Sequence, residues 1–365
     1  MNLKTMQIMA FPGKYIQGNG AINHLPDIME KYGARSFVVA TKSMLATAQG
    51  LLADKGKVEQ FGGECSEAEI VRIMELVMAN DTTALAAIGG GKVIDCCKIV
   101  ADKLGIPVIV VPTIAATDAP CSGCAVIYTE EGVYDHVYYQ KNNPNVVLMD
   151  TNIIAKAPMR YLISGMGDGL ATFFEANSCR RSGSLNECGG LSTLTAMSIA
   201  RLCLDTILKY GRQAVKDSQQ GIVSEALEAI IEANTLLSGI GFESCGLGAA
   251  HSIHNGLTVL AGTHSLYHGE KVAFGVITGL QLIDELNLID EVYDFFIDLG
   301  LPVCFEDLGL GDITEEQIIA VAANCCGEGN FMYHEPFAFD VSTIANAIKE
   351  ADAIGRKKKL LKAIK

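Results

Sequence analysis

Four of the chain's seven histidines lie close together in the segment 249–275, at His251, His254, His264 and His268. Imidazole is the commonest protein ligand for Zn²⁺ and also suits Fe²⁺. His251 and His254 lie one turn apart if AAHSIHNGL forms a helix, as its alanines indicate. The cluster therefore points to a metal site. The other interpretation is that these histidines form ordinary hydrogen bonds at helix ends.

A carboxylate would complete such a ligand set, and Asp168 in ISGMGDGLATFFEANS is the candidate. We expect Asp168 near the start of a helix and between glycines, where an acidic side chain serves something other than packing. Two imidazoles and one carboxylate form a ligand set that zinc enzymes use.

A second candidate site is the glycine turn Gly89-Gly90-Gly91-Lys92, between the apolar run TALAAIG and the helical pattern KVIDCCKIVADKLG. Glycines let backbone amides approach a ligand, and the helix that follows offers unpaired N–H groups, so the turn could hold phosphate. The sequence is neither GxGxxG nor GxxxxGK[ST], so a plain tight connection stays open as the alternative.

A third candidate is Asp118, which lies between two prolines in PTIAATDAP, directly after the apolar run PVIVV. In α/β sheets, ligands bind at the carboxyl ends of the strands. We therefore expect Asp118 to serve function rather than structure.

The elements that must position these residues change character near residue 157. Before it, short β-branched runs alternate with helical patterns, the rhythm of a parallel sheet with crossover helices. After it, long alanine- and leucine-rich periodic stretches predict helices over 193–211, 224–241, 274–286 and 314–326. We predict an α/β dinucleotide-binding domain over 1–157 and an all-α domain over 158–365 that binds metal and substrate.

Composition narrows the class of protein. The 365 residues are 49% hydrophobic, enough to bury two cores, and the formal net charge is −14. That charge argues against binding to nucleic acid or membrane, and we interpret the basic tail RKKKLLKAIK as a solvated final helix. No apolar run is long enough to span a membrane. Twelve cysteines without a signal peptide predict a cytoplasmic protein with free thiols.

Six motifs, in the order of the chain, carry a resemblance to a known family: GGGKVIDCCK, VPTIAATDAP, NVVLMDTNIIAKAP, SGMGDGLAT, GFESCGLGAAHSIHNGLT and YHGEKVAFG. The chain resembles the glycerol dehydrogenases of the iron-containing, or group III, alcohol dehydrogenase family. The likeness runs from about residue 10 to 350. It implies a dehydroquinate synthase-like architecture, with the active site between the two domains and assembly into large homo-oligomers, for which an octamer is one expected form.

The resemblance also implies roles for individual residues. Asp168, His251 and His268 correspond to the metal ligands, Asp118 to the residue that binds the substrate hydroxyls, and His254 to a pocket histidine able to relay a proton. The positions that correspond to cofactor-binding residues are Gly89, Gly90, Gly91, Lys92, Asp95, Thr113, Thr117, Ser122, Cys124, Val126 and Tyr128.

Two positions depart from the family pattern. Iron-using branches usually carry a further histidine four residues after the ligand aspartate, where this chain has Thr172, so zinc is expected and Fe²⁺ is the alternative. Glycerol dehydrogenases usually carry an aspartate after the second strand that binds the adenosine ribose. This chain has Thr41 and then Lys42, so NAD is expected and NADP is not excluded.

The resemblance implies an enzyme that oxidises glycerol or a related vicinal diol to dihydroxyacetone, reversibly, with hydride transfer to NAD(P). The main alternative is a dehydrogenase for a 2-hydroxycarboxylate or another small diol, although Asp118 would repel a carboxylate. Glycerol-1-phosphate dehydrogenases and dehydroquinate synthases need basic residues for a phosphate, and Lys271 is the nearest one to the metal motifs. A sensor or structural subunit that binds nucleotide and metal without turnover also stays open.

Overall fold

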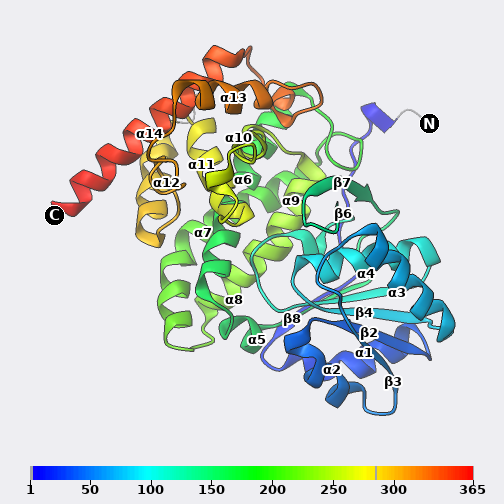
Figure 1. Cartoon of the computed structure of the whole chain (residues 1–365). Coiled ribbons are helices and arrows are strands. Elements are labelled where there is room, and N and C mark those ends of the chain that lie inside the picture. Colours follow the sequence, from blue (N-terminus) through cyan, green and yellow to red (C-terminus); the bar gives the residue numbers. More distant parts are fainter. Residues whose placement is uncertain (1–2, 284–285, 365) are drawn as a thin grey trace.

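The computed structural model describes residues 3–283 and 286–364. It confirms the expected fold class, because a parallel α/β half is followed by a half built from helices (Figure 1). All strands of the described chain lie before residue 151. The polypeptide passes into the helical half through the short helix α5 (Thr151–Ala155) and the start of α6 (Met159–Ser182).

The main sheet has six parallel strands in the order β1-β8-β5-β4-β2-β3. Its central strands are apolar on both faces and fully buried, as a sheet covered by helices on both sides requires. The strands are β1 (Tyr15–Gly18), β2 (Ser36–Ala40), β3 (Gly56–Gln60), β4 (Ala84–Gly89), β5 (Val108–Pro112) and β8 (Val146–Asp150).

Each face of the sheet packs on its own pair of helices. Helices α1 (Leu25–Tyr32) and α2 (Leu45–Leu52) cover the face that carries Val38 and Ile109. Helices α3 (Glu67–Ala79) and α4 (Gly91–Leu104) cover the face that carries Val39 and Val110. Because β2, β4 and β5 are neighbouring parallel strands, their carboxyl ends lie beside one another, next to the helical half.

A separate antiparallel hairpin, β6 (Cys124–Tyr128) and β7 (Tyr134–Tyr139), was not expected from the sequence. Strand β7 is mostly exposed and reads YDHVYY, so it lacks the apolar alternation by which half-buried strands are found. Strand β6 packs on α4 through Ala125 and Ile127 and leaves its other face partly open.

The second half of the chain is helical, and its long helices pack around α6 and α11. Between α8 and α9 the helix continues as one π-helical segment, Ala233–Leu237. The helices are α6, α7 (Leu194–Gln219), α8 (Glu225–Glu232), α9 (Ser238–Cys245), α10 (Ala249–Leu257), α11 (His268–Gly279), α12 (Leu286–Leu299), α13 (Glu315–Cys325) and α14 (Val341–Ala363).

Three local expectations need correction or completion. The apolar segment LATAQGLLADKG, 45–56, predicts a helix through residue 56, but α2 ends at Leu52, because Ala53 adopts a positive φ of 45° and the chain turns into β3. The helix expected over 274–286 ends at Gly279, and its residues 284–285 lie outside the described part. Asp168 does not lie at a helix start, because α6 begins nine residues before it.

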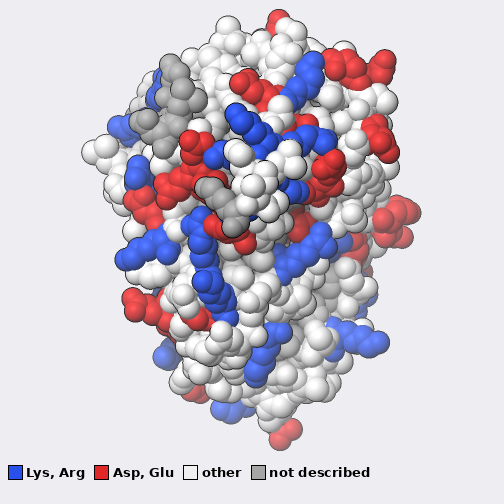
Figure 2. Space-filling view, turned by 90° about the vertical axis from the view of Figure 1, so that its left-hand side faces the viewer, with Lys and Arg blue, Asp and Glu red and all other residues white. Residues whose placement is uncertain are grey.

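The basic tail forms the end of α14, as expected, apart from residue 365, which lies outside the described residues. Its cations pair with acids: Arg356 with Glu306, and Lys358 with Asp290. Figure 2 views this side of the molecule and shows Lys and Arg interspersed with Asp and Glu. Among the described residues, no helix has the length and apolar character needed to cross a bilayer.

Candidate metal and substrate site

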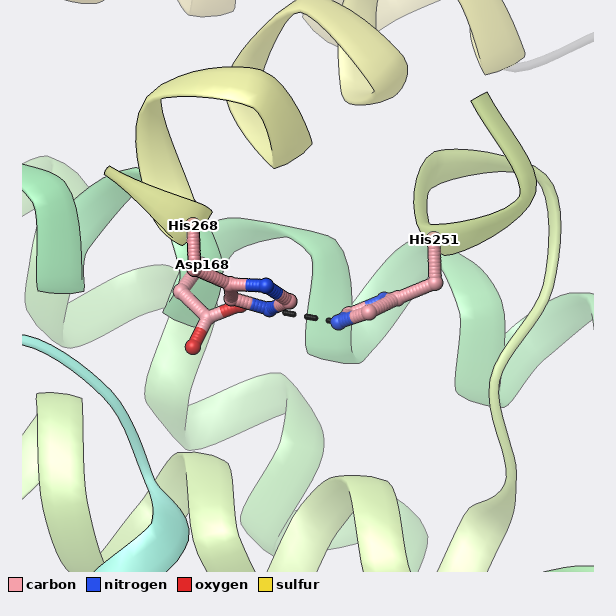
Figure 3. Close-up of side chains that lie close together, drawn as sticks. All are labelled: Asp168, His251 and His268. Atoms are coloured by element: carbon pink, nitrogen blue, oxygen red, sulfur yellow. Dashed lines mark ion pairs between the residues drawn. The ribbon is translucent and has the colours of Figure 1, made fainter. Parts of the chain in front are cut away.

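Three helices bring the predicted metal ligands together (Figure 3). Asp168 comes from the middle of α6, His251 from the first turn of α10, and His268 is the first residue of α11. One ligand atom from each lies within 4.8 Å of the others. The sequence prediction therefore selected residues that the fold places side by side.

The hydrogen bonds of the three histidines fix which ring nitrogens carry hydrogen. His251 Nδ1 lies 2.8 Å from Glu175 Oε2, so it must donate, because a carboxylate only accepts. His254 Nδ1 donates to Asn255 Oδ1 at 3.0 Å, which leaves His254 Nε2 as the acceptor for His268 Nδ1, also at 3.0 Å. In the neutral tautomers that these contacts select, the Nε2 atoms of His251 and His268 carry lone pairs.

Both lone pairs face Asp168. Its Oδ1 lies 3.1 Å from His268 Nε2 and 3.6 Å from His251 Nε2, yet this buried oxygen accepts no hydrogen bond. In these neutral tautomers, three electron-pair donors converge on one point. A buried acceptor without a partner is costly, and a divalent cation would satisfy all three atoms at once. These residues fit a metal ion.

The electrostatics favour positive charge at the same place. Burial alone would raise the pKa of Asp168, but His268 and His251 outweigh it and hold that pKa well below its usual value. Burial would likewise lower the pKa of His251, but Glu175 and Asp168 outweigh it and hold the pKa well above its usual range. A proton on Nε2 and a metal ion beside it are alternatives that the same carboxylates favour.

His254 has the opposite environment. Burial, followed by the charges of His268 and His251, lowers its pKa well below the usual value, so the ring is neutral. Its ring lies 4.3 Å from that of His268, centroid to centroid, and each of its nitrogens has a protein partner. The structure thus places His254 beside His268, one of the predicted ligands. Its role in proton relay stays a prediction.

Asp118 lies in the loop after β5 and reaches the helical half. Its Oδ2 accepts a hydrogen bond of 2.7 Å from Ser238 Oγ at the start of α9. Burial, and then the charge of Asp168, raise the pKa of Asp118 to about 8, whereas Ser238 and His251 lower it. The two carboxyl groups are therefore close enough to influence each other's ionisation.

Thr172 is the position at which the resemblance led us to look for a further histidine. It lies one turn after Asp168, is 2% exposed, and its Oγ1 is 3.0 Å from Ser238 Oγ. Since Ser238 donates its hydrogen to Asp118, Thr172 must donate to Ser238. Within the described residues, the metal cluster contains two imidazoles and no third.

The glycine turn lies where the strands end. Gly89 closes β4 with a φ of 155°, and a Cβ there would come within 2.5 Å of Thr41 Cγ2. Thr113 N donates to Gly89 O at 3.0 Å, so Thr41 and Thr113 flank the turn. A Cβ on Gly91 would meet nothing within 4 Å. The backbone at the N-terminus of α4 is thus open to a ligand.

The other predicted cofactor residues divide into two groups. Cys124, Val126 and Tyr128 alternate along β6 and share its partly open face, and Lys92 lies 5.1 Å above the Tyr128 ring and pairs with Glu64. Thr117 is partly buried in the loop before Asp118.

Asp95 and Ser122, by contrast, are enclosed. Asp95 is 6% exposed and bonds to Val126 N and Lys98 Nζ, whereas Ser122 is fully buried and donates to Ala119 O. These contacts tie α4 to the loop before β6. A direct cofactor contact for either side chain stays a prediction.

The structure adds residues that the sequence did not single out. Glu175 holds the ring of His251, and the only signal for it is its spacing of seven residues, two helical turns, from Asp168. Asn234, in the π-helical segment, donates to Ala115 O and Leu162 O and so fixes the loop that carries Asp118. No sequence motif marks Asn234, because its two partners are backbone carbonyls.

The two cysteines near the start of β6, Cys121 and Cys124, are not both exposed. Cys121 is fully buried, and burial raises its pKa far above the usual value. Cys124 is partly exposed, and burial raises its pKa to about 12. All twelve cysteines are free thiols. Since the thiolate is the reactive form, neither thiol of this loop is primed for oxidation.

Comparison with known proteins identifies the family of the chain. The sequence profile of the family described as iron-containing alcohol dehydrogenase matches residues 12–151. A glycerol dehydrogenase of Thermotoga maritima is 47% identical, covering 96% of this chain and 98% of the relative. One from Escherichia coli is 42% identical, with coverages of 96% and 98%. The crystal structure of glycerol dehydrogenase from Schizosaccharomyces pombe superposes with a TM-score of 0.93 at 34% identity, over 100% of this chain and 94% of that one. The chain therefore belongs to the iron-containing alcohol dehydrogenase family of oxidoreductases, alongside relatives that are named glycerol dehydrogenase.

Proposed function

We propose that the chain is a metal-dependent polyol dehydrogenase. It oxidises glycerol, or a related vicinal diol, at its secondary hydroxyl and transfers hydride to a nicotinamide cofactor, reversibly. With glycerol the product is dihydroxyacetone. The proposal places Asp168, His251 and His268 as metal ligands and Asp118 as the group that binds the substrate hydroxyls.

One observation carries the proposal: Asp168 Oδ1 converges with the Nε2 atoms of His251 and His268, and the charge of Asp168 helps to raise the pKa of a second carboxyl group, Asp118. A metal ion at such a site would supply a Lewis acid that favours loss of a hydroxyl proton, and the nicotinamide ring would accept the hydride. The chain's own task is to orient the diol between these groups and to exclude water.

Asp118 gives the site its preference for a neutral substrate. A metal cation nearby would favour the ionised form of Asp118, and in that form the carboxylate accepts hydrogen bonds from hydroxyl groups but repels a substrate carboxylate. Ser238 and Thr172 hold it in place through two successive hydrogen bonds. This favours a polyol over the 2-hydroxycarboxylate of the alternative reading.

For the metal, we propose Zn²⁺, with Fe²⁺ as the alternative. Three protein ligands with open positions are the usual pattern of catalytic zinc. Thr172, which takes the place of a further histidine, is already bonded to Ser238. For the cofactor, we propose NAD at the turn Gly89–Gly91. NADP is the alternative, because Thr41, which flanks that turn, carries no negative charge that would repel the 2′-phosphate of NADP.

The proposal predicts metal-dependent reduction of NAD with glycerol. Metal-stripped full-length protein, reloaded with Zn²⁺ or Fe²⁺, is assayed at 340 nm with NAD and with NADP, using glycerol, 1,2-propanediol and lactate. We expect turnover with the diols, little with lactate, and none without metal. Asp168→Asn should lose both metal binding and turnover, because the amide cannot supply the anionic ligand.

Glu306→Gln on the surface is a suitable control, because Glu306 is exposed, lies in the segment between α12 and α13, and forms an ion pair with Arg356 of α14. Turnover with lactate but not with diols would transfer the proposal to a hydroxycarboxylate. Zinc binding without turnover on any of these substrates would contradict the polyol assignment.

A further inference from the structure

We propose that Glu175 is a positioning residue of the metal site, which holds His251 in the one ring orientation and tautomer that can bind metal. The inference rests on the proposed metal site and adds a residue to it. Its basis is that one carboxylate contacts both the backbone and the ring of the same ligand.

The contacts of Glu175 are short and buried. Its Oε1 accepts from the backbone N of Gly248 and of His251, both at 2.9 Å, and its Oε2 accepts from His251 Nδ1 at 2.8 Å. The residue is 2% exposed. Both oxygens are therefore engaged at the first turn of α10, where free N–H groups and the helix dipole favour an anion.

The consequence for His251 is a fixed tautomer. Because Glu175 Oε2 can only accept, Nδ1 carries the hydrogen and Nε2 keeps the lone pair that faces Asp168. Asp168 and Glu175 lie on one face of α6, two turns or about 10 Å apart, and the imidazole lies between them. One helix thus supplies a ligand at one end of the ring and the fixing group at the other.

Glu335 provides a matched comparison at the same helix end. It is 7% exposed, and its Oε1 accepts from Ala249 N at 2.7 Å, so it too caps the first turn of α10. Its Oε2 has no hydrogen-bond partner, and neither oxygen contacts an imidazole. Glu175 and Glu335 therefore share the capping role, and they differ in the contact with His251.

The test compares Glu175→Gln with Glu335→Gln in the full-length protein. In Glu175→Gln, the amide oxygen can satisfy either the backbone N–H groups or the ring, but not both. If the NH₂ group faces Nδ1, the ring hydrogen moves to Nε2. If it faces the backbone, it opposes two other donors. In Glu335→Gln, the oxygen keeps its bond to Ala249 N and the NH₂ group replaces an oxygen without a partner.

Zn²⁺ affinity is measured on metal-stripped protein by competition with a chromophoric chelator, and the ligand field is read from the visible spectrum of the Co²⁺-loaded protein. We expect Zn²⁺ affinity to fall about 10–100-fold in Glu175→Gln, as for other partners of ligand histidines, with an altered Co²⁺ spectrum. Glu335→Gln should keep the affinity and the spectrum of the unchanged chain.

Equal affinities for all three proteins would overturn the inference and leave the metal site intact. Equal losses in both variants would also overturn it, because helix capping would then explain the effect. Failure of the unchanged chain to bind Zn²⁺ would contradict the metal site itself. Should Glu175→Gln not fold, the Co²⁺-loaded unchanged chain still decides the matter. Its hyperfine-shifted proton spectrum should contain two exchangeable ring N–H signals, from His251 and His268, and a single signal overturns the inference.

Discussion

At the candidate site, the pKa values of Asp118, Asp168 and His251 are set by burial and by neighbouring charged groups. Asp118 shows the cost of this arrangement most clearly, because it is a partly buried carboxyl group placed near another carboxyl group. Burial and the charge of Asp168 raise its pKa from 3.8 to about 8. A group held in this way favours function at the expense of stability, as active-site residues often do.

The raised pKa predicts the effect of Asp118→Asn on stability. Between pH 4 and 8 the folded metal-free protein binds a proton that the unfolded chain releases, so its stability falls as pH rises, by about 1.4 kcal/mol per pH unit. An asparagine cannot ionise and avoids this loss. Thermal unfolding of the metal-free proteins should therefore show Asp118→Asn gaining on the unchanged chain from pH 5 to pH 9, while losing turnover. A difference in midpoint that is the same at both pH values would contradict the shifted pKa.

At this scale, the sequence predicted the candidate metal ligands and missed the residues that hold the site in place. Histidine spacing and a carboxylate are visible in one dimension, and His251, His268 and Asp168 do converge. Glu175 and Ser238 were not predicted, because their partners come from other helices and glutamate and serine are common in any helix. Only the fold shows that Glu175 contacts His251 and that Ser238 contacts Asp118.

At the scale of elements, the glycines around Asp168 are explained by helix packing rather than by a helix start. A Cβ on Gly167 would overlap Gly269 O, and one on Gly269 would overlap Ser164 O. Helices α6 and α11 therefore approach backbone to backbone, and that approach brings Asp168 and His268 together. The glycines around Asp168 did mark a special position in the sequence, but the reason for them is the close approach of α6 and α11.

This packing predicts that Gly269→Ala is destabilising. The added methyl group must push α11 away from α6, at a cost of about 1–3 kcal/mol for overpacking. The shift should also weaken metal binding, because His268 is the residue before Gly269. Gly50→Ala in α2 is the matched control. A Cβ there meets nothing within 4 Å, so the change should add roughly 0.5–1 kcal/mol. Denaturant unfolding and Zn²⁺ titration of both variants measure these effects, and equal stability changes would refute the packing argument.

The elements themselves were largely predictable where a regular apolar period exists. The buried strands β2, β4, β5 and β8 and the helices α3, α4, α7 and α13 follow such periods closely. The hairpin of β6 and β7 was not predicted, because an exposed tyrosine-rich strand is held by its partner strand and has no apolar face of its own. The π-helical segment has no sequence signature of the same kind.

At the scale of the whole molecule, the two halves share their interior. A single cluster of buried apolar side chains extends from Phe37 in β2 to Ala351 in α14. Hydrogen bonds join the halves as well: Asn234 to Ala115 O, Ser238 to Asp118, and Glu243 to Gly123 N. We propose that the boundary near residue 157 separates two architectures that depend on each other for stability.

A shared interior predicts cooperative unfolding. Far-ultraviolet circular dichroism and tyrosine fluorescence, the natural probe in a chain without tryptophan, should report one coincident transition in urea, for the metal-free and for the zinc-loaded protein. Separate expression of 1–157 should give a polypeptide that does not fold, because α3 and α4 would lose part of the core they share. Two resolved transitions would show instead that the halves are independent.

The bond from Gly123 to Glu243 has a consequence for the time scale on which the loop opens. Gly123 lies in the turn before β6, where amide hydrogens ordinarily exchange with deuterium in solvent quickly. Here the amide of Gly123 donates to the buried carboxylate of Glu243 in α9, and its nitrogen lies 2.7 Å from Glu243 Oε1. Its exchange requires this hydrogen bond between the two halves to open. We therefore expect the Gly123 amide to be labelled as slowly as the central strands of the sheet.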